Sequence, residues 1–225
     1  AYKVLGKKEL SALFSANPDK YYKVGLFDKV GFQRHKCIQC AKFFWSLVDR
    51  TSCPDHEAYG FLGNPPTSKR LDYIDAWKEV KAFFGSNEHT IVNRYPVVCR
   101  WRDDLYYTIA SIVNFQRVVE NKVFFELPAN PLVVPQMCVR FNDIENVGLS
   151  GRHYTTFCMI GQTCDADAEG GYWKDRCIDL DYQLLTKILG IDPAAITFVE
   201  DVWMGAGAFG NSLEYFVNGL ELGNA

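Results

Sequence analysis

Residues 132–160 read LVVPQMCVRFNDIENVGLSGRHYTTFCMI, and this stretch decides the fold. Residues 132–141 are mostly apolar, and apolar residues return over 154–160, so each segment predicts a strand. The residues between them, 142–152, are polar and include glycine, which is typical of a long loop. The stretch therefore predicts two neighbouring antiparallel strands joined by a polar connection.

Cationic and aromatic residues stand where these two strands meet the loop. Arg140 ends the first strand, Arg152 and His153 begin the return, and Phe157 follows four residues later. Arginine binds phosphate oxygens in a bidentate manner, and an aromatic ring can cover a nucleotide base. From residue types alone this indication of a nucleotide site is weak, because arginines at strand ends are usually solvated and phenylalanine usually belongs to the core.

The rest of the chain mixes helical and strand patterns. The first helical stretch places Leu10, Leu13 and Phe14 on one face and is broken at 17–19. The sequence predicts helices over residues 7–31, 72–84 and 175–189. It predicts further strands over 89–92, 197–202 and 214–217. Residues 104–116 are a mixed segment, and residues 205–210 are a glycine-rich turn. This order predicts an α+β fold. The rigid turn at residues 64–67 predicts a lead-in with a knuckle over 1–66 and a main domain over 67–225.

Composition excludes several classes of protein. The chain has 225 residues with 48% hydrophobic and 23% charged residues, ordinary values for a folded domain. A formal net charge of -3 means that nucleic-acid binding would need a local basic patch. The sequence has no run of about twenty apolar residues, so we expect no membrane-spanning helix. Residues 1–8 lack the apolar stretch of a signal peptide. Eight cysteines without a disulfide-like spacing indicate a reduced compartment, the cytoplasm.

Four potential metal ligands lie in one short polar segment. Cys37 and Cys40 form one pair, and Cys53 and His56 form the second, with twelve residues between the pairs. Three thiolates and one imidazole complete a closed tetrahedral site, which suits structural Zn²⁺. The alternative is that these are free thiols beside an exposed histidine. A closed site would fold a segment too small to have its own core.

The literal residues resemble a known family. The stretch from Cys138 to Met159 is similar to motif 2 of alanyl-tRNA synthetases, and four further stretches resemble the archaeal branch of that family in the same order. These are YGFLGNPPT at 59–67, RYPVV with RWRDD at 94–104, PANPLVVPQ at 128–136, and FVEDVW with the glycine turn and EYF at 198–216. The resemblance implies a class II synthetase core, an antiparallel sheet flanked by helices, with the zinc knuckle as a small N-terminal addition.

The resemblance also implies site residues, substrates and partners. Arg140, Arg152 and His153 would be catalytic and would contact the triphosphate of ATP together with Mg²⁺; the other implied ATP-binding residues are Glu145, Phe157 and Met159. Alanine would be bound by Trp203, Glu214 and Asn224. The implied enzyme forms alanyl-adenylate and transfers alanine to tRNA(Ala). No covalent enzyme intermediate is needed, so Cys158 is not interpreted as a nucleophile.

Some positions depart from the family pattern. Cys158 stands where the family usually has glutamate, Asn211 where proline is common, and Leu149 where a basic residue is common. The sequence ends before the region that resembles motif 3, so we expect activity to need a C-terminal region or a second chain. The alternative hypothesis is a truncated paralogue that acts as a non-catalytic RNA- or protein-binding module.

Overall fold

The computed structural model describes residues 5–57, 65–120, 122–205 and 208–225. The chain forms two compact units, one from residues 1–70 and 173–225 and the other from residues 71–172. This division is not the one expected at residue 66, because a strand near residue 45 pairs with a strand near residue 198. Most of the YGFLGNPPT motif, residues 59–64, and part of the glycine-rich turn, residues 206 and 207, lie outside the described residues.

The first unit is built on a five-stranded antiparallel sheet. In spatial order the strands are β1 (Gln33–Lys36), β2 (Phe43–Ser46), β8 (Ile196–Gly205), β9 (Ala208–Val217) and β10 (Leu220–Asn224). The strands β8 and β9 pair from Ile196 opposite Val217 to Gly205 opposite Ala208. The strands predicted at 197–202 and 214–217 are confirmed within longer elements, whereas β1, β2 and β10 were not predicted.

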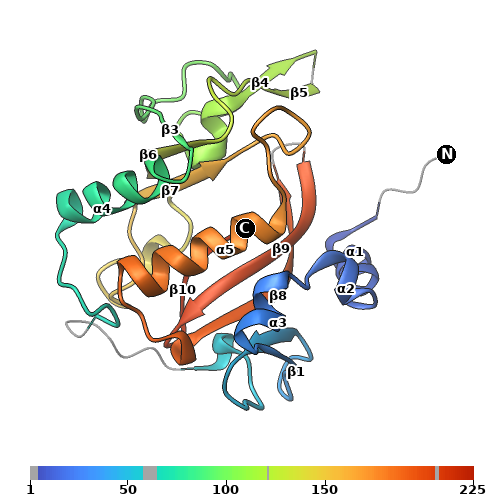
Figure 1. The fold of residues 1–225 in the computed structure, drawn as a ribbon. Coiled ribbons are helices and arrows are strands. Elements are labelled where there is room, and N and C mark those ends of the chain that lie inside the picture. The colour runs from blue at the N-terminus through green and yellow to red at the C-terminus, as the bar shows by residue number, and fades with distance from the viewer. Residues whose placement is uncertain (1–4, 58–64, 121, 206–207) are drawn as a thin grey trace. The chain divides into compact units, whose positions relative to one another are not determined.

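Helices cover one face of this sheet. They are α1 (Lys7–Ser15), α2 (Pro18–Tyr21), α3 (Gly25–Val30) and α5 (Lys174–Gln183), which continues as a turn of π-helix over Leu184–Ile188. Figure 1 shows α5 lying along β8, β9 and β10. Gly31, with φ of 100°, ends α3, and Gly190, with φ of 69°, follows the π-helical turn. Only glycine adopts these left-handed conformations without strain.

Alternation along β8 explains this layer. Ile196, Phe198 and Val202 point to the helical face, where they pack in one buried cluster with Leu10, Phe14, Phe27 and Ile178. The prediction for the first helix is confirmed for Leu10 and Phe14 but wrong for Leu13, which is 46% exposed. The other sheet face has a smaller buried cluster of Cys37, Phe44, Cys53, Val199 and Phe216. Burial on both faces makes β8 the central strand of the unit.

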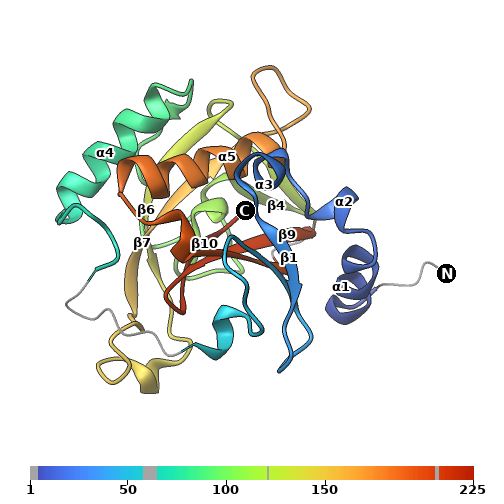
Figure 2. The same cartoon turned by 60° about the horizontal axis from the view of Figure 1, so that its bottom comes forward.

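The second unit contains the hairpin quoted above. The strand β6 (Leu132–Val139) lies between β3 (Thr90–Ile91), which is parallel to it, and β7 (Thr156–Thr163), which is antiparallel. The helix α4 (Tyr73–Gly85) lies beside β6 and β7 in Figure 2. Its N-terminus is capped by Asp72, whose carboxylate accepts a 2.8 Å bond from the backbone N–H of Asp75.

The remaining elements of this unit are short. The segment predicted as mixed contains a 3-10 helix, Ser111–Phe115, followed by a two-stranded hairpin of β4 (Gln116–Val119) and β5 (Lys122–Phe125). Phe115 packs with Leu132 and Val134 to form the buried centre of the unit. This packing fixes β6, from which the polar loop departs.

Membrane insertion by a helix has no support in the described ranges, where no helix is both long and apolar enough to cross a bilayer.

Candidate functional site

The strand pairing of β6 and β7 sorts the predicted nucleotide-binding residues by face. Cys138 lies opposite Phe157, and Gln136 lies opposite Met159. Because side chains alternate along a strand, Phe157 and Met159 share one face of the hairpin, and Arg140 extends that face at the end of β6. Cys158 pairs with Met137 and therefore lies on the other face. The alternation along Phe157, Cys158 and Met159 thus places the two residues predicted to contact adenine on one face and the thiol on the other.

Arg140 and Phe157 are brought into contact. The guanidinium carbon of Arg140 lies 5.1 Å from the ring centroid of Phe157, within the range of a cation–π interaction. The Nε of Arg140 donates a 2.7 Å hydrogen bond to the carbonyl of Ile109. On the same face, the sulfur of Met159 accepts a bond from the backbone N–H of Ser111 at 3.4 Å. A cation, a ring and a thioether are therefore held side by side by two strands and the segment that includes residues 109–111.

The other predicted ATP-binding residues lie along the connecting loop. Glu145 is exposed within a short 3-10 helix, Ile144–Asn146. The hydroxyl oxygen of Ser150 accepts bonds from the backbone N–H groups of Arg152 and His153, each at 3.2 Å, and lies 2.5 Å from Nδ1 of His153. This turn orders the start of the returning strand. The structure thus joins Arg140 to Phe157 directly, and it places Glu145, Arg152 and His153 on the loop at the same end of the hairpin.

A hollow of about 550 Å³ lies on the other face of the hairpin, away from Phe157. The hydroxyl of Tyr73, on α4, lies 3.7 Å from the sulfur of Met137. The hollow contains none of the predicted ATP-binding residues; it is lined by Tyr73, Arg94, Tyr95, Pro96, Val97 and Met137. Burial raises the pKa of the nearby Cys158 thiol, against the effects of Tyr73 and Arg94. A protonated thiol is a weak nucleophile, in agreement with a non-catalytic Cys158.

The three predicted alanine-binding residues share one face of the five-stranded sheet. Glu214 lies directly opposite both Val199 on β8 and Asn224 on β10. Trp203 is four residues beyond Val199 and therefore points to the same face. At roughly 3.3 Å per residue, this places Trp203 about 13 Å along the strand from the Glu214 position. Glu214 and Asn224 are thus immediate neighbours, whereas Trp203 stands at the far end of the same face.

Negative charge gathers between these positions. Burial and, after it, the carboxylates of Asp201 and Glu221 together raise the pKa of Glu214 to about 7, while Lys42 opposes them. Asp201 lies opposite Ser212, between Glu214 and Trp203 on the same face. Sequence reasoning missed Asp201; its position two residues before Trp203, at the strand period, was the available signal. The face can attract an ammonium group, such as that of an amino acid.

The four cysteine and histidine ligands predicted for zinc come together. One ligand atom from each of Cys37, Cys40, Cys53 and His56 lies within 4.8 Å of all the others. The sulfurs of Cys40 and Cys53 are 3.6 Å apart. A tetrahedral site with Zn–S bonds of about 2.3 Å needs sulfurs about 3.8 Å apart, so the spacing and the donor set both fit zinc.

The surroundings of this cluster connect it to the sheet. Cys37 and Cys53 are buried against Phe44, Val199 and Phe216, on the face that also presents Glu214. Burial raises the pKa of Cys53 to about 12. At Cys37 burial acts in the same direction, but backbone N–H groups, including those of Cys53 and Cys40, outweigh it and lower the pKa to about 6. The cluster therefore contains one thiol that ionises readily, which favours metal capture.

Comparisons with known proteins show which family the sequence matches. A family model described as "tRNA synthetases class II (A)" matches residues 79–221. The chain is 62% identical over 224 residues to the alanine–tRNA ligase of Nitrosopumilus maritimus, covering 98% of this chain and 25% of that protein. The corresponding ligase of Cenarchaeum symbiosum is 57% identical over 221 residues, and that of Methanocella arvoryzae 43% identical over 223 residues; each match covers 97% of this chain and 25% of the relative.

The family model and the relatives both identify a tRNA synthetase, but they cover different shares of the sequences compared. The chain spans about a quarter of the length of the curated relatives that it matches. The family model alone covers well over half of the chain, including the hairpin of Arg140 and Phe157 and the strands of Trp203 and Glu214. The chain belongs to the class II (A) family of tRNA synthetases.

Proposed function

We propose that this chain forms the ATP- and alanine-handling part of an alanine–tRNA ligase. The observation that supports this best is the contact between Arg140 and Phe157 on one face of the hairpin, because it pairs a phosphate-binding cation with a base-stacking ring. The relatives that match are named alanine–tRNA ligases. Since the chain spans a quarter of their length, the complete reaction is proposed for it together with the remaining region that such ligases contain, in the same or a second chain.

The proposed first step joins alanine to ATP. An oxygen of the alanine carboxylate attacks the α-phosphorus, a new P–O bond forms, and the bond to the β-phosphate breaks to release pyrophosphate. Arg140 would stabilise the charge that grows on the α-phosphate. Arg152 and His153 would hold the outer phosphates, and Phe157 with Met159 would hold the adenine. Glu145 would lie close to ATP. Mg²⁺, when bound, neutralises charge on the triphosphate.

The second substrate would occupy the sheet face of the first unit. Trp203 would form the wall beside the small methyl group of alanine, and Glu214 and Asn224 would lie near its polar end. The acidic character of this face, with Asp201 and Glu214 as neighbours, supports a site for an ammonium group. The alanyl group would then pass to the terminal ribose of tRNA(Ala). We therefore propose that the protein acts in the cytoplasm, where these substrates are used.

We further propose that Cys37, Cys40, Cys53 and His56 bind structural Zn²⁺. A closed set of four ligands leaves no position for a substrate, so the metal would take no part in the reaction. Its role would be to stabilise residues 37–56 on the sheet face that presents Glu214. Zinc would thereby stabilise the sheet face that presents Glu214 and would not take part in the reaction.

The test is alanine-dependent exchange between ATP and pyrophosphate. The chain is combined with the complementary region of the Nitrosopumilus maritimus ligase, and we expect exchange above background. Arg140→Ala should lower the rate by about 100-fold or more, because one charge-stabilising donor is lost. Arg117→Ala, which removes an arginine from β4 in the same unit, is the matched control and should leave the rate unchanged. Background exchange with both parts folded would contradict the proposal and favour an RNA- or protein-binding module.

A further inference from the structure

The central strand β8 loses one of its two neighbours halfway along. On one side β9 accompanies it over its full length. On the other side β2 pairs only with residues 197–199, and among the described residues no strand pairs with this edge beyond Val199. Trp203 lies on the part that has a single strand partner. An open strand edge is more mobile and exposes backbone groups, so something else must fix its position.

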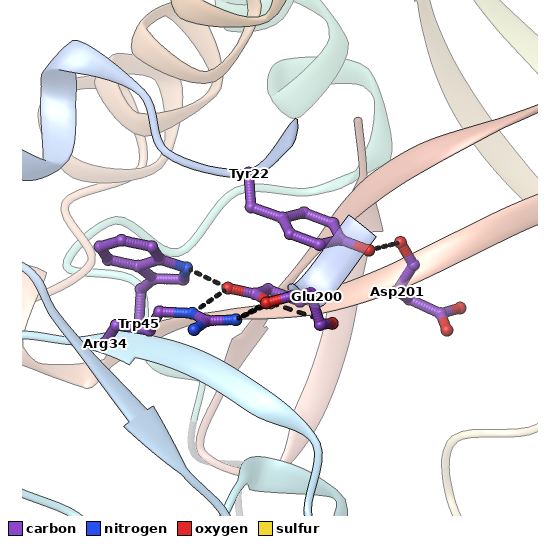
Figure 3. Close-up of polar contacts among 6 residues, drawn as sticks. Tyr22, Arg34, Trp45, Glu200 and Asp201 are labelled. Atoms are coloured by element: carbon purple, nitrogen blue, oxygen red, sulfur yellow. Dashed lines mark hydrogen bonds and ion pairs between the residues drawn. The ribbon is translucent and has the colours of Figure 1, made fainter. Parts of the chain in front are cut away.

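Glu200, the first residue past the last β2 pair, is anchored by side chains from three other elements (Figure 3). One carboxylate oxygen accepts bonds from Nε of Arg34 at 2.7 Å and from the indole N–H of Trp45 at 2.9 Å. The other accepts from a terminal guanidinium nitrogen of Arg34 at 2.8 Å and from the hydroxyl of Ser15 at 3.4 Å. Glu200 is 4% exposed. A buried carboxylate with this many donors is held in one geometry.

The N-terminal segment also contacts β8 beyond its last pair with β2. The hydroxyl of Tyr22, which follows α2, donates a 2.9 Å hydrogen bond to the backbone carbonyl of Asp201. The ammonium of Lys7 lies 2.7 Å from the carboxylate of Asp201. On β9, the side-chain amide of Asn211 donates to the backbone carbonyl of Tyr21 at 2.5 Å. Contacts to residues 200, 201 and 211 therefore surround the base of the hairpin that bears Trp203.

We propose that Glu200 and Tyr22 are positioning residues that fix the Trp203 end of β8, so that the N-terminal helices set the shape of the alanine pocket. The inference rests on the proposed function for the identity of the ligand. Neither residue needs to touch the substrate, because Glu200 points to the helical face and Trp203 to the opposite one. Rigid support of this kind holds a binding wall in place before the ligand arrives.

The experiment uses the indole N–H signals of the ¹⁵N-labelled chain, which has five tryptophans. Tyr22→Phe deletes only the hydroxyl that reaches Asp201, and Glu200→Gln removes the charge that holds Arg34. Tyr182→Phe is the matched control, since it deletes a hydroxyl from the same helical layer. The Trp45 signal reports directly whether the Glu200 contact is lost, and urea unfolding checks that each variant is folded.

In Tyr22→Phe and Glu200→Gln we expect the Trp203 signal to broaden or split, and the Trp77 and Trp101 signals of the other unit to stay in place. Alanine affinity, read from the movement of the Trp203 signal, should fall about fivefold, the factor equivalent to about 1 kcal/mol. Tyr182→Phe should match the unmodified chain. An unchanged Trp203 signal in both folded variants would overturn the inference. Failure of alanine to move the Trp203 signal of the unmodified chain, even with the complementary region of the ligase added, would instead contradict the proposed function. The broadening of the Trp203 signal in the variants would still decide the positioning role.

Discussion

Asp181 is a buried carboxyl group within a helix that packs on a sheet. It lies on α5, is 6% exposed, and burial raises its pKa to about 8. Its neighbour Tyr215 on β9 is half-buried; desolvation raises the pKa of that phenol, and the charges of Asp181 and Cys177 raise it further. Asp181 is therefore protonated in the folded chain at neutral pH but ionised in the unfolded chain, where its pKa is about 3.9. Such a group makes stability depend on pH.

The sign of that dependence follows from the raised value. The contribution of Asp181 to the free energy of unfolding is fully present below about pH 4 and is lost as the pH rises through about 8. Between these limits the free energy of unfolding should decrease by about 1.4 kcal/mol per pH unit from this residue. Asp181→Asn should remove the slope, and urea unfolding at pH 5, 6, 7 and 8 measures it. Glu214 makes the free energy of unfolding depend on pH in the same direction up to about pH 7. The difference between the unmodified chain and Asp181→Asn therefore isolates the contribution of Asp181. Parallel pH profiles for the two chains would refute the assignment.

Individual site residues differ in how far the sequence could predict them. The grouping of Arg140 with Phe157 was implied by the family resemblance, since residue types alone indicated a nucleotide site only weakly. The cluster of Cys37 with its three partners was predicted from spacing alone. Asp201 and Glu200 were not predicted. Their roles depend on which neighbours β8 lacks, and a strand sequence does not state where its partner strand stops.

At the scale of elements, the segment that bears the four proposed zinc ligands has little regular structure. Residues 37–56 include one short strand, β2, and a 3-10 turn, Pro54–His56. Its buried packing comes from Phe44, which clusters with Cys37 and Cys53, and from Trp45, which joins the main core. A bound ion would add folding free energy at the two ends that bear the four ligands.

Metal exchange tests the ligand set directly. The chain refolded with Co²⁺ should show the d–d absorption of a tetrahedral site with thiolate ligands, and stoichiometric Zn²⁺ should abolish it. Cys53→Ser should lose the absorption and lower the thermal midpoint. Cys99→Ser replaces a buried thiol outside the cluster and should retain the spectrum. An octahedral spectrum, or equal spectra for both variants, would exclude this site.

Elements with strong internal patterns were predicted, and those that depend on distant partners were not. The β6–β7 hairpin, α4 and α5 each have a clear period and clear end signals, and the structure confirms them. The strands β1 and β2 are four residues each, and β1 is polar and partly exposed. They are strands because β2 pairs with β8 about 150 residues later, which no local pattern shows.

At the scale of the whole molecule, the two units differ in how the chain builds them. Residues 71–172 form one unit from a continuous segment, with its own buried centre around Phe115 and Leu132. The other unit needs residues 1–70 and 173–225 together. A continuous unit with a core of its own can fold alone.

We therefore expect the two units to behave differently when they are expressed as separate fragments. Residues 71–172 expressed alone should give a cooperative urea transition and a dispersed NMR spectrum. Outside residues 37–56, the chain of residues 1–70 alone should remain unfolded with or without Zn²⁺, because Phe27 loses the ring of Phe198 and Trp45 loses Phe198 as its strand partner. Mixing residues 1–70 with a peptide of residues 173–225 should restore structure. Cooperative folding of residues 1–70 alone would contradict the division into these two units.

The pairing of β2 with β8 has a consequence for synthesis on the ribosome. Ser46 leaves the exit tunnel about 150 residues before its partner Thr197, which at ~5–20 residues per second is a delay of roughly 8–30 s. During that interval the run Phe43-Phe44-Trp45 has no sheet to join and is a target for chaperones or for sticking to other nascent chains. Early capture of Zn²⁺ by the neighbouring cysteines would shield this run until translation delivers the missing strand.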